Sequence, residues 1–234
     1  MRTIFWKIFS ARPLHIGVLF AVVLCAASLL PQKTPASTSS QAAVHEVAQL
    51  VNGHYNNLHS LRAGFTESYE GLGMSRSESG TLLLLKPGRM KWDYTSPAGK
   101  LFLLDGKYAW SWSRGAAQVQ RIPAKQLDDL RSPLRFLLGR TELEKELTHL
   151  TVSPGPEGVF VLSGVPKGQE NRIRTVELNV TAVGAITAIK IEENDGAITR
   201  FTFTGEQPNA PIPENVFHFT PPAGVPVVDA LPPV

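Results

Sequence analysis

The sequence is poor in the residues on which most catalytic and metal sites depend. Its 234 residues include one cysteine, Cys25. A single cysteine excludes an internal disulfide framework, a multi-cysteine zinc site and an iron–sulfur cluster. There is also no G-x-S-x-G turn around a nucleophilic serine and no phosphate-binding P-loop. His54 and His59 are five residues apart without an acidic third ligand nearby, so we interpret them as solvated. We therefore expect no metal, no cofactor and no enzymatic activity.

Charged residues are scarce as well. They make up 18% of the chain, and the formal net charge is +3. Residues 1–36 account for this excess, because they hold four basic residues and no acidic one, which leaves 19 basic and 20 acidic residues in the remainder. A nearly neutral folded part has no basic stripe to neutralise phosphates, so we expect no nucleic-acid partner.

Residues 1–36 have the layout of a secretory signal. Basic residues precede an apolar run from Leu14 to Leu30, which ends at Pro31 and is followed by small residues. We expect cleavage between residues 36 and 43. The apolar run of 17 residues is at the short limit for a membrane span, so an uncleaved anchor is the alternative.

Strand-like alternation dominates the rest of the chain. Helical spacing predicts a helix over residues 42–60 and shorter helices over 124–138 and 142–150. Elsewhere apolar residues alternate with polar ones, and a last strand is expected around Phe217 and Phe219. Hairpin turns are predicted at Asp105-Gly106 and Asn194-Asp195-Gly196. We predict a mainly β fold with some α: a barrel or strongly curved sheet of antiparallel strands.

Two strands, Leu82–Leu85 and Leu101–Leu104, are apolar on both faces, whereas a half-buried antiparallel strand is apolar on one. Large rings at Trp92, Trp110 and Trp112 add to this apolar surface. Two interpretations remain open. Helices and a second layer cover both faces, or one face of a curved sheet holds a lipid beneath the leucine-rich helices.

A set of short motifs lies between residues 80 and 225. They are Gly80-Thr81-Leu82-Leu83-Leu84-Leu85-Lys86-Pro87, Met90-Lys91-Trp92-Asp93-Tyr94, Pro97, Asp105-Gly106, Trp110, Ser132-Pro133 and Phe219-Thr220-Pro221-Pro222-Ala223-Gly224-Val225. In this order they resemble the outer-membrane lipoprotein carrier family, LolA, of Gram-negative bacteria. The resemblance runs from about residue 43 to residue 229, which we expect to form a single carrier domain.

The resemblance implies an open, incomplete antiparallel β-barrel closed by a helical lid. Its cavity would hold the acyl chains of a lipoprotein released by an inner-membrane ABC transporter. The protein would cross the periplasm, act as a monomer and pass its cargo to an outer-membrane receptor of similar fold, without covalent chemistry.

The resemblance also suggests binding residues. Lys86 occupies the place of a family arginine that holds the lid closed, and a lysine, with three donors and no planar fork, should hold it less firmly. Met90 and Trp92 match cavity-facing positions. Alternation adds further candidates, each of which could instead be ordinary core: Phe65, Leu82, Leu84, Leu101, Leu103, Trp110, Phe201 and Phe203.

Two alternatives share the fold. One is a periplasmic sensor of lipids or lipoproteins that regulates a membrane partner; such sensors usually have an additional C-terminal domain. The other is an outer-membrane lipoprotein receptor, which requires a lipidated cysteine. Cys25 follows the bulky Leu24, which argues against lipidation.

Overall fold

The computed structural model describes residues 36–124 and 142–229. All of them belong to one unit, Pro35–Val234. The predicted export signal lies outside the described residues except for Ala36, and the predicted leucine-rich helix over 124–138 lies outside them except for Ala124.

The described residues form one large sheet with few helices. The helices are α1 (Ala36–Asn56), α3 (Leu143–Glu146) and the 3-10 helices η2 (Pro156–Gly158) and η3 (Glu214–Phe217). The strands are β1 (Ser60–Gly71), β2 (Met74–Leu85), β3 (Arg89–Ser96), β4 (Ala98–Asp105), β5 (Tyr108–Ser113), β6 (Val119–Pro123), β7 (Leu147–Pro154), β8 (Phe160–Pro166), β9 (Ile173–Val180), β10 (Ile186–Glu193), β11 (Ile198–Pro208) and β12 (Val227–Asp229).

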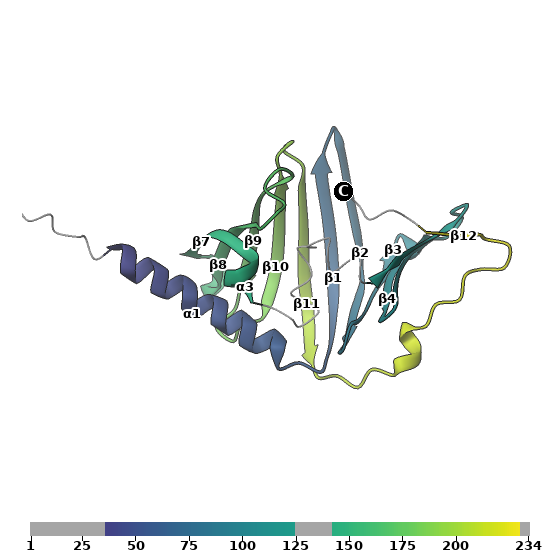
Figure 1. Cartoon of the computed structure of the whole chain (residues 1–234), viewed down its shortest axis with the longest axis horizontal. Coiled ribbons are helices and arrows are strands. Elements are labelled where there is room, and N and C mark those ends of the chain that lie inside the picture. Colours follow the sequence, from purple (N-terminus) through teal and green to yellow (C-terminus); the bar gives the residue numbers. More distant parts are fainter. Residues whose placement is uncertain (1–35, 125–141, 230–234) are drawn as a thin grey trace, which may run out of the picture. The chain divides into compact units, whose positions relative to one another are not determined.

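The sheet is open. Its strand order is β12-β6-β5-β4-β3-β2-β1-β11-β10-β9-β8-β7, so β12 and β7 are its two edges (Figure 1). Neighbouring strands are antiparallel except for β12 and β6, which pair in parallel. The predicted mainly β, antiparallel and incompletely closed architecture is confirmed.

Both predicted hairpin turns are present. Asp105-Gly106 leads from β4 to β5, and Asn194-Asp195-Gly196 leads from β10 to β11. The two turn glycines have φ of 94° and 89°, a region that costs glycine little and other residues much more. These turns fix the antiparallel pairing of the strands on either side of them.

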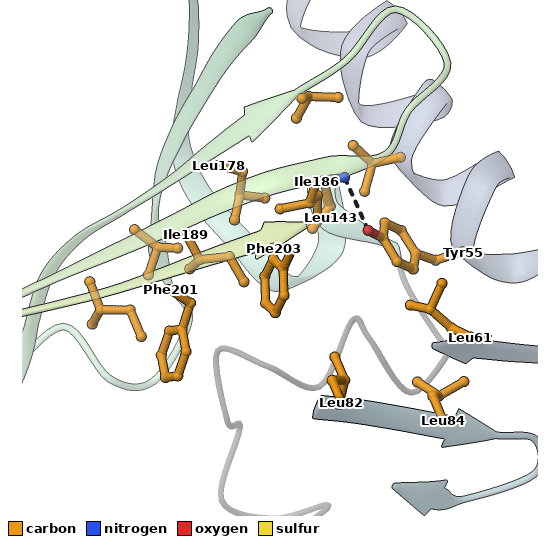
Figure 2. Packing of buried hydrophobic residues seen from close by; sticks show 14 of the residues in the cluster. Tyr55, Leu61, Leu82, Leu84, Leu143, Leu178, Ile186, Ile189, Phe201 and Phe203 are labelled. Carbon is orange, nitrogen blue, oxygen red and sulfur yellow. Dashed lines mark hydrogen bonds between the residues drawn. The ribbon is translucent and has the colours of Figure 1, made fainter. Parts of the chain in front are cut away.

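Helix α1 covers one end of the sheet. It packs mainly against β7, β8 and α3 (Figure 1), through a buried stripe that includes Val47, Val51 and Tyr55. The Tyr55 hydroxyl accepts a hydrogen bond of 3.0 Å from the backbone N–H of Ile186 in β10 (Figure 2). Burial, together with the charge of Glu206, raises the pKa of Tyr55 above its ordinary value, so the hydroxyl stays protonated. The predicted helix over residues 42–60 is thus present, but it ends at Asn56.

Two local predictions are wrong. The helix expected over residues 142–150 exists only at Leu143–Glu146, and Leu147 begins strand β7, which pairs with β8. The strand expected around Phe217 and Phe219 is absent: Phe217 ends the 3-10 helix η3. Both segments are short, and a few regularly spaced apolar residues do not distinguish a helix from a strand.

Candidate functional site

The two faces of the sheet differ, and cross-strand register assigns each side chain to one of them. Leu82 lies opposite Trp92, and Leu84 lies opposite Met90. Directly opposed residues share a face. We call this the inner face; it belongs to the same buried cluster as the apolar stripe of α1. Phe65 extends the inner face into β1.

Five rings form an aromatic cluster on the inner face. The centroid of the Trp92 ring is 4.7 Å from that of Phe65, 5.4 Å from Phe201 and 6.1 Å from Phe203. Tyr94 approaches Phe65 at 5.0 Å. The Trp92 indole N–H contacts the Met90 sulfur at 2.8 Å, so its single donor does not require water. We call Phe65, Trp92, Tyr94, Phe201 and Phe203 the inner aromatic cluster.

Gly80 allows Tyr94 to join this cluster. A Cβ atom at Gly80 would lie 2.1 Å from the Asp93 carbonyl oxygen and 2.8 Å from the Tyr94 Cα. Only glycine therefore permits β2 and β3 to approach so closely here, where their register also shifts. The glycine of the G-T-L-L-L-L motif thus has a packing role beside the apolar surface.

The inner aromatic cluster is carried by strands other than those that α1 chiefly contacts. Among the described residues, α1 makes its main contacts with β7, β8 and α3, whereas the cluster is carried by β1, β3 and β11. Figure 2 shows Phe201 and Phe203 projecting from β11, with Leu82 and Leu84 of β2 nearby. Leu82, Leu84 and the rings of the cluster are all less than 10% exposed. This part of the sheet is thus a continuous buried apolar region, held together by packing and by the Trp92–Met90 contact.

Lys86 joins the end of β2 to the last turn of α1. Its ammonium group donates to the backbone carbonyls of Tyr55 (2.6 Å) and Asn56 (3.1 Å). Carbonyls in the last turn of a helix have no partner within the helix, and a positive charge favours that end. Burial lowers the pKa of Lys86 from its ordinary value. A contact between Lys86 and a helix is thus present, and that helix is α1.

Three predicted lining residues lie on the wrong face. Leu101 is opposite Asp93, and Leu103 is opposite both Lys91 and Trp110. Because Lys91 and Asp93 alternate with the inner-face residues of β3, these three lie on the outer face. Strand β4 is apolar on both faces, so alternation could not choose between them; the register turns Phe102 and Leu104 inward instead.

The outer face holds a second aromatic group beneath the C-terminal segment. Phe219 packs on Trp110 (5.7 Å between ring centroids) and Trp112 (6.3 Å). The indole N–H of Trp110 donates to Asp105 at 2.7 Å. Asp105 also accepts the backbone N–H groups of Lys107 and Tyr108. Desolvation by burial acts to raise the pKa of Asp105, but these hydrogen bonds outweigh it, and the pKa is lowered.

An Asp105→Asn variant is expected to lower the Tm by about 2–4 °C at pH 7, because one hydrogen bond worth about 1 kcal/mol is lost. Because the pKa of Asp105 is lower in the folded protein than in the unfolded chain, its charged carboxylate stabilises the fold at pH values above the unfolded pKa of about 3.9. This stabilisation is lost as the pH falls through the pKa of Asp105 in the folded protein. The difference in Tm between variant and wild type should therefore shrink below about pH 4.

Thermal unfolding followed by circular dichroism between pH 3 and pH 7 measures this difference. Asp93→Asn, at an exposed position of β3, is the control and should change the Tm little. A difference for Asp105→Asn that stays constant across the range contradicts the assignment.

Within residues 36–124 and 142–229, no group of three or more His, Cys, Asp or Glu side chains could hold a metal ion. The interpretation of His54 as solvated is wrong: its side chain is 13% exposed and its Nε2 lies 2.7 Å from Glu206 in β11. This pair gives α1 another polar contact with the sheet.

No helix in the described part of the chain is long and apolar enough to span a membrane.

A polar group at one end of the inner face escaped the sequence analysis. Glu67 and Glu78 lie directly opposite each other in β1 and β2, with Lys100 and Arg76 close by. The alternation that places Phe65 on the inner face also places Glu67 there. The alternation along β1 could therefore have identified Glu67, but a search for apolar residues on one face passes over a charged residue on that face.

The chain resembles known proteins over most of its length. Residues 56–220 match the family described as outer membrane lipoprotein carrier protein LolA. An outer-membrane lipoprotein carrier protein of Chromobacterium violaceum is 29% identical, over 90% of this chain and 97% of its own. One from Cupriavidus taiwanensis is 30% identical, over 88% of this chain and 96% of its own. The crystal structure of an uncharacterized conserved protein from Thermus thermophilus shares the fold, with a TM-score of 0.52 at 14% identity, covering 80% of this chain and 99% of that one.

Proposed function

Because this chain belongs to the outer membrane lipoprotein carrier (LolA) family, we propose that it carries lipoproteins through the periplasm. An inner-membrane ABC transporter would supply the cargo, and an outer-membrane receptor would accept it. The carrier would act as an exported monomer and bind and release its cargo without a covalent step.

The apolar inner face is the observation that carries this proposal. Burying an acyl chain gains roughly 0.8 kcal/mol per CH₂ group, so an acylated protein needs a cover while it crosses water. The inner aromatic cluster and its neighbours Leu82, Leu84 and Met90 offer such a cover. Because these side chains make no directional bond to a hydrocarbon, cargo can leave once an alternative apolar environment is reached.

We propose further that Lys86 is a latch. Its two hydrogen bonds fasten the end of α1 to β2, beside Leu84 on the inner face. Movement of α1 away from the sheet requires both bonds to break. Lysine makes this fastening weaker than the family arginine would, because it lacks the planar fork that binds two acceptors together.

Purification of the full chain from the periplasm of a Gram-negative host tests the carrier function. Mass spectrometry of the purified material is expected to find acylated proteins bound to it, enriched over an unrelated periplasmic protein that carries the same affinity tag. Enrichment of no acylated protein, or only of a non-acylated segment of a membrane protein, contradicts the proposal; the second result is the one expected of a regulator.

A further inference from the structure

The turn between β1 and β2 exposes two large apolar side chains. Gly71 pairs with Met74, so Leu72 and Gly73 form a two-residue turn. Leu72 is 75% exposed and Met74 is 62% exposed. Single exposed apolar residues are common on protein surfaces, but two of them at one turn call for an explanation. We call Leu72 and Met74 the hairpin tip.

The backbone conformation of Leu72 is also unfavourable. Its φ is 51° and that of Gly73 is 74°. A two-residue hairpin turn with positive φ favours Asn, Asp or Gly at its first position, because a Cβ atom at positive φ crowds the following carbonyl oxygen. In the described part of the chain, the other non-glycine residues with positive φ are polar: His149, Glu157 and Asn209. Leucine at position 72 thus costs stability through strain as well as exposure, and such strain is concentrated at functional sites.

The hairpin tip lies at the extreme end of the sheet. The pairing of β2 with β3 begins at Ser79, so residues 74–78 have no partner in β3. At about 3.3 Å per residue, this segment extends roughly 15 Å beyond the end of β3. Figure 1 shows the end of the β1–β2 hairpin reaching past β3 and β4. A flat surface that approaches this end of the sheet therefore meets Leu72 and Met74 before it meets β3 or β4.

Amphipathic side chains lie behind the hairpin tip. Tyr69 and Arg76 are directly opposed, and the Arg76 guanidinium lies 5.2 Å from the centroid of the Tyr69 ring. Tyrosine and arginine suit a boundary between hydrocarbon and water, because each combines apolar carbon with a polar end. Exposed charges beside the tip are Glu70, Arg76 and Asp195, two acidic and one basic. Attraction to anionic lipids therefore contributes little here.

A lipid surface fits these features better than a protein partner. A specific protein interface buries at least about 1,000 Å², which two side chains on a narrow hairpin do not provide. A bilayer requires no matching surface, because it accepts any apolar group that reaches its hydrocarbon. We propose that Leu72 and Met74 insert weakly and reversibly into a lipid bilayer, with Tyr69 and Arg76 at the level of the headgroups.

This contact goes beyond the proposed carrier function and does not depend on it. Two side chains bury less apolar area than a myristoyl chain, which by itself is only a marginal anchor. The hairpin tip would therefore hold the protein briefly at a membrane and let it leave again.

Flotation with uncharged vesicles tests the insertion. Protein purified from the periplasm is mixed with vesicles of phosphatidylcholine and phosphatidylethanolamine, and the bound fraction is measured against lipid concentration. Leu72→Asn is expected to weaken binding about tenfold, because it removes most of the inserted apolar area. Its Tm should rise by about 2 °C, since asparagine tolerates positive φ better than leucine, so the loss of binding is not unfolding. Wild-type binding should persist in about 0.5 M sodium chloride, because charge contributes little.

Val183→Asn is the matched control and should leave vesicle binding unchanged. Val183 is 71% exposed, but it lies in the turn between β9 and β10, at the opposite end of the sheet. Met74→Trp then locates the contact: its added fluorescence should shift to the blue with vesicles and be quenched by nitroxide-labelled lipids, above the wild-type background.

Three results would overturn the insertion: a wild type that does not float with vesicles, equal losses for Leu72→Asn and Val183→Asn, or a Met74→Trp signal that lipids do not quench. Binding only to vesicles that contain inner-membrane proteins would also overturn it, because the hairpin tip would then dock on a protein. None of these results bears on the carrier function, which is tested by the acylated proteins that co-purify with the chain.

Discussion

A Trp92→Glu variant is expected to bind an N-palmitoyl peptide at least about 100-fold more weakly than the wild type, a loss of about 2.8 kcal/mol. Trp92 contacts Phe65, Phe201 and Phe203 in the inner aromatic cluster. A carboxylate at this position removes those contacts and places a charge where the acyl chain would lie. Burying an unpaired carboxylate beneath a hydrocarbon costs several kcal/mol, so the chain is excluded.

Trp112→Glu is the matched control, because it makes the same substitution on the outer face of the sheet, against Phe219. Binding is measured by fluorescence polarisation of a labelled palmitoyl peptide, and circular dichroism checks that each variant is folded. Leu84→Glu repeats the test on β2. If folded Trp92→Glu retains its affinity, or if both tryptophan variants lose affinity equally, the inner face is not the acyl-binding surface.

Strands β3 and β4 show what the sequence could and could not predict. In β3, polar residues separate Met90, Trp92 and Tyr94, so alternation identified one buried face, and the structure agrees. In β4, the run Leu101-Phe102-Leu103-Leu104 has no polar residue to mark a face. The face is set there by pairing with β3, which is a long-range property of the folded sheet.

Short elements were predicted less well for a related reason. Leu143, Leu147 and Leu150 have helical spacing, but this covers only two turns, and pairing of β7 with β8 outweighs so weak a local preference. The Lys86 contact was predicted in part. The resemblance indicated a latch at this position, but only the structure identifies its acceptors as the carbonyls of Tyr55 and Asn56.

A Lys86→Leu variant is expected to release bound palmitoyl peptide about tenfold faster than the wild type, because loss of hydrogen bonds from a partly exposed ammonium group weakens the closed arrangement by about 1.4 kcal/mol. The fold itself should persist, with a Tm lowered by only about 2–4 °C per kcal/mol lost. Stopped-flow measurement of release to an excess of unlabelled vesicles gives the rate. Lys86→Arg is the control; it retains donors and should release no faster than the wild type.

Hydrogen exchange separates a latch from an ordinary helix cap. If Lys86 fastens α1, amide exchange in Lys86→Leu should accelerate along α1 toward Val51, because the helix end leaves the sheet as a unit. A cap would accelerate exchange only in the last turn, next to Tyr55 and Asn56. If release is faster but exchange accelerates only in that turn, α1 stays on the sheet, and a different element must move to release the cargo. A normal release rate shows that the two hydrogen bonds stabilise the helix end without controlling the cargo.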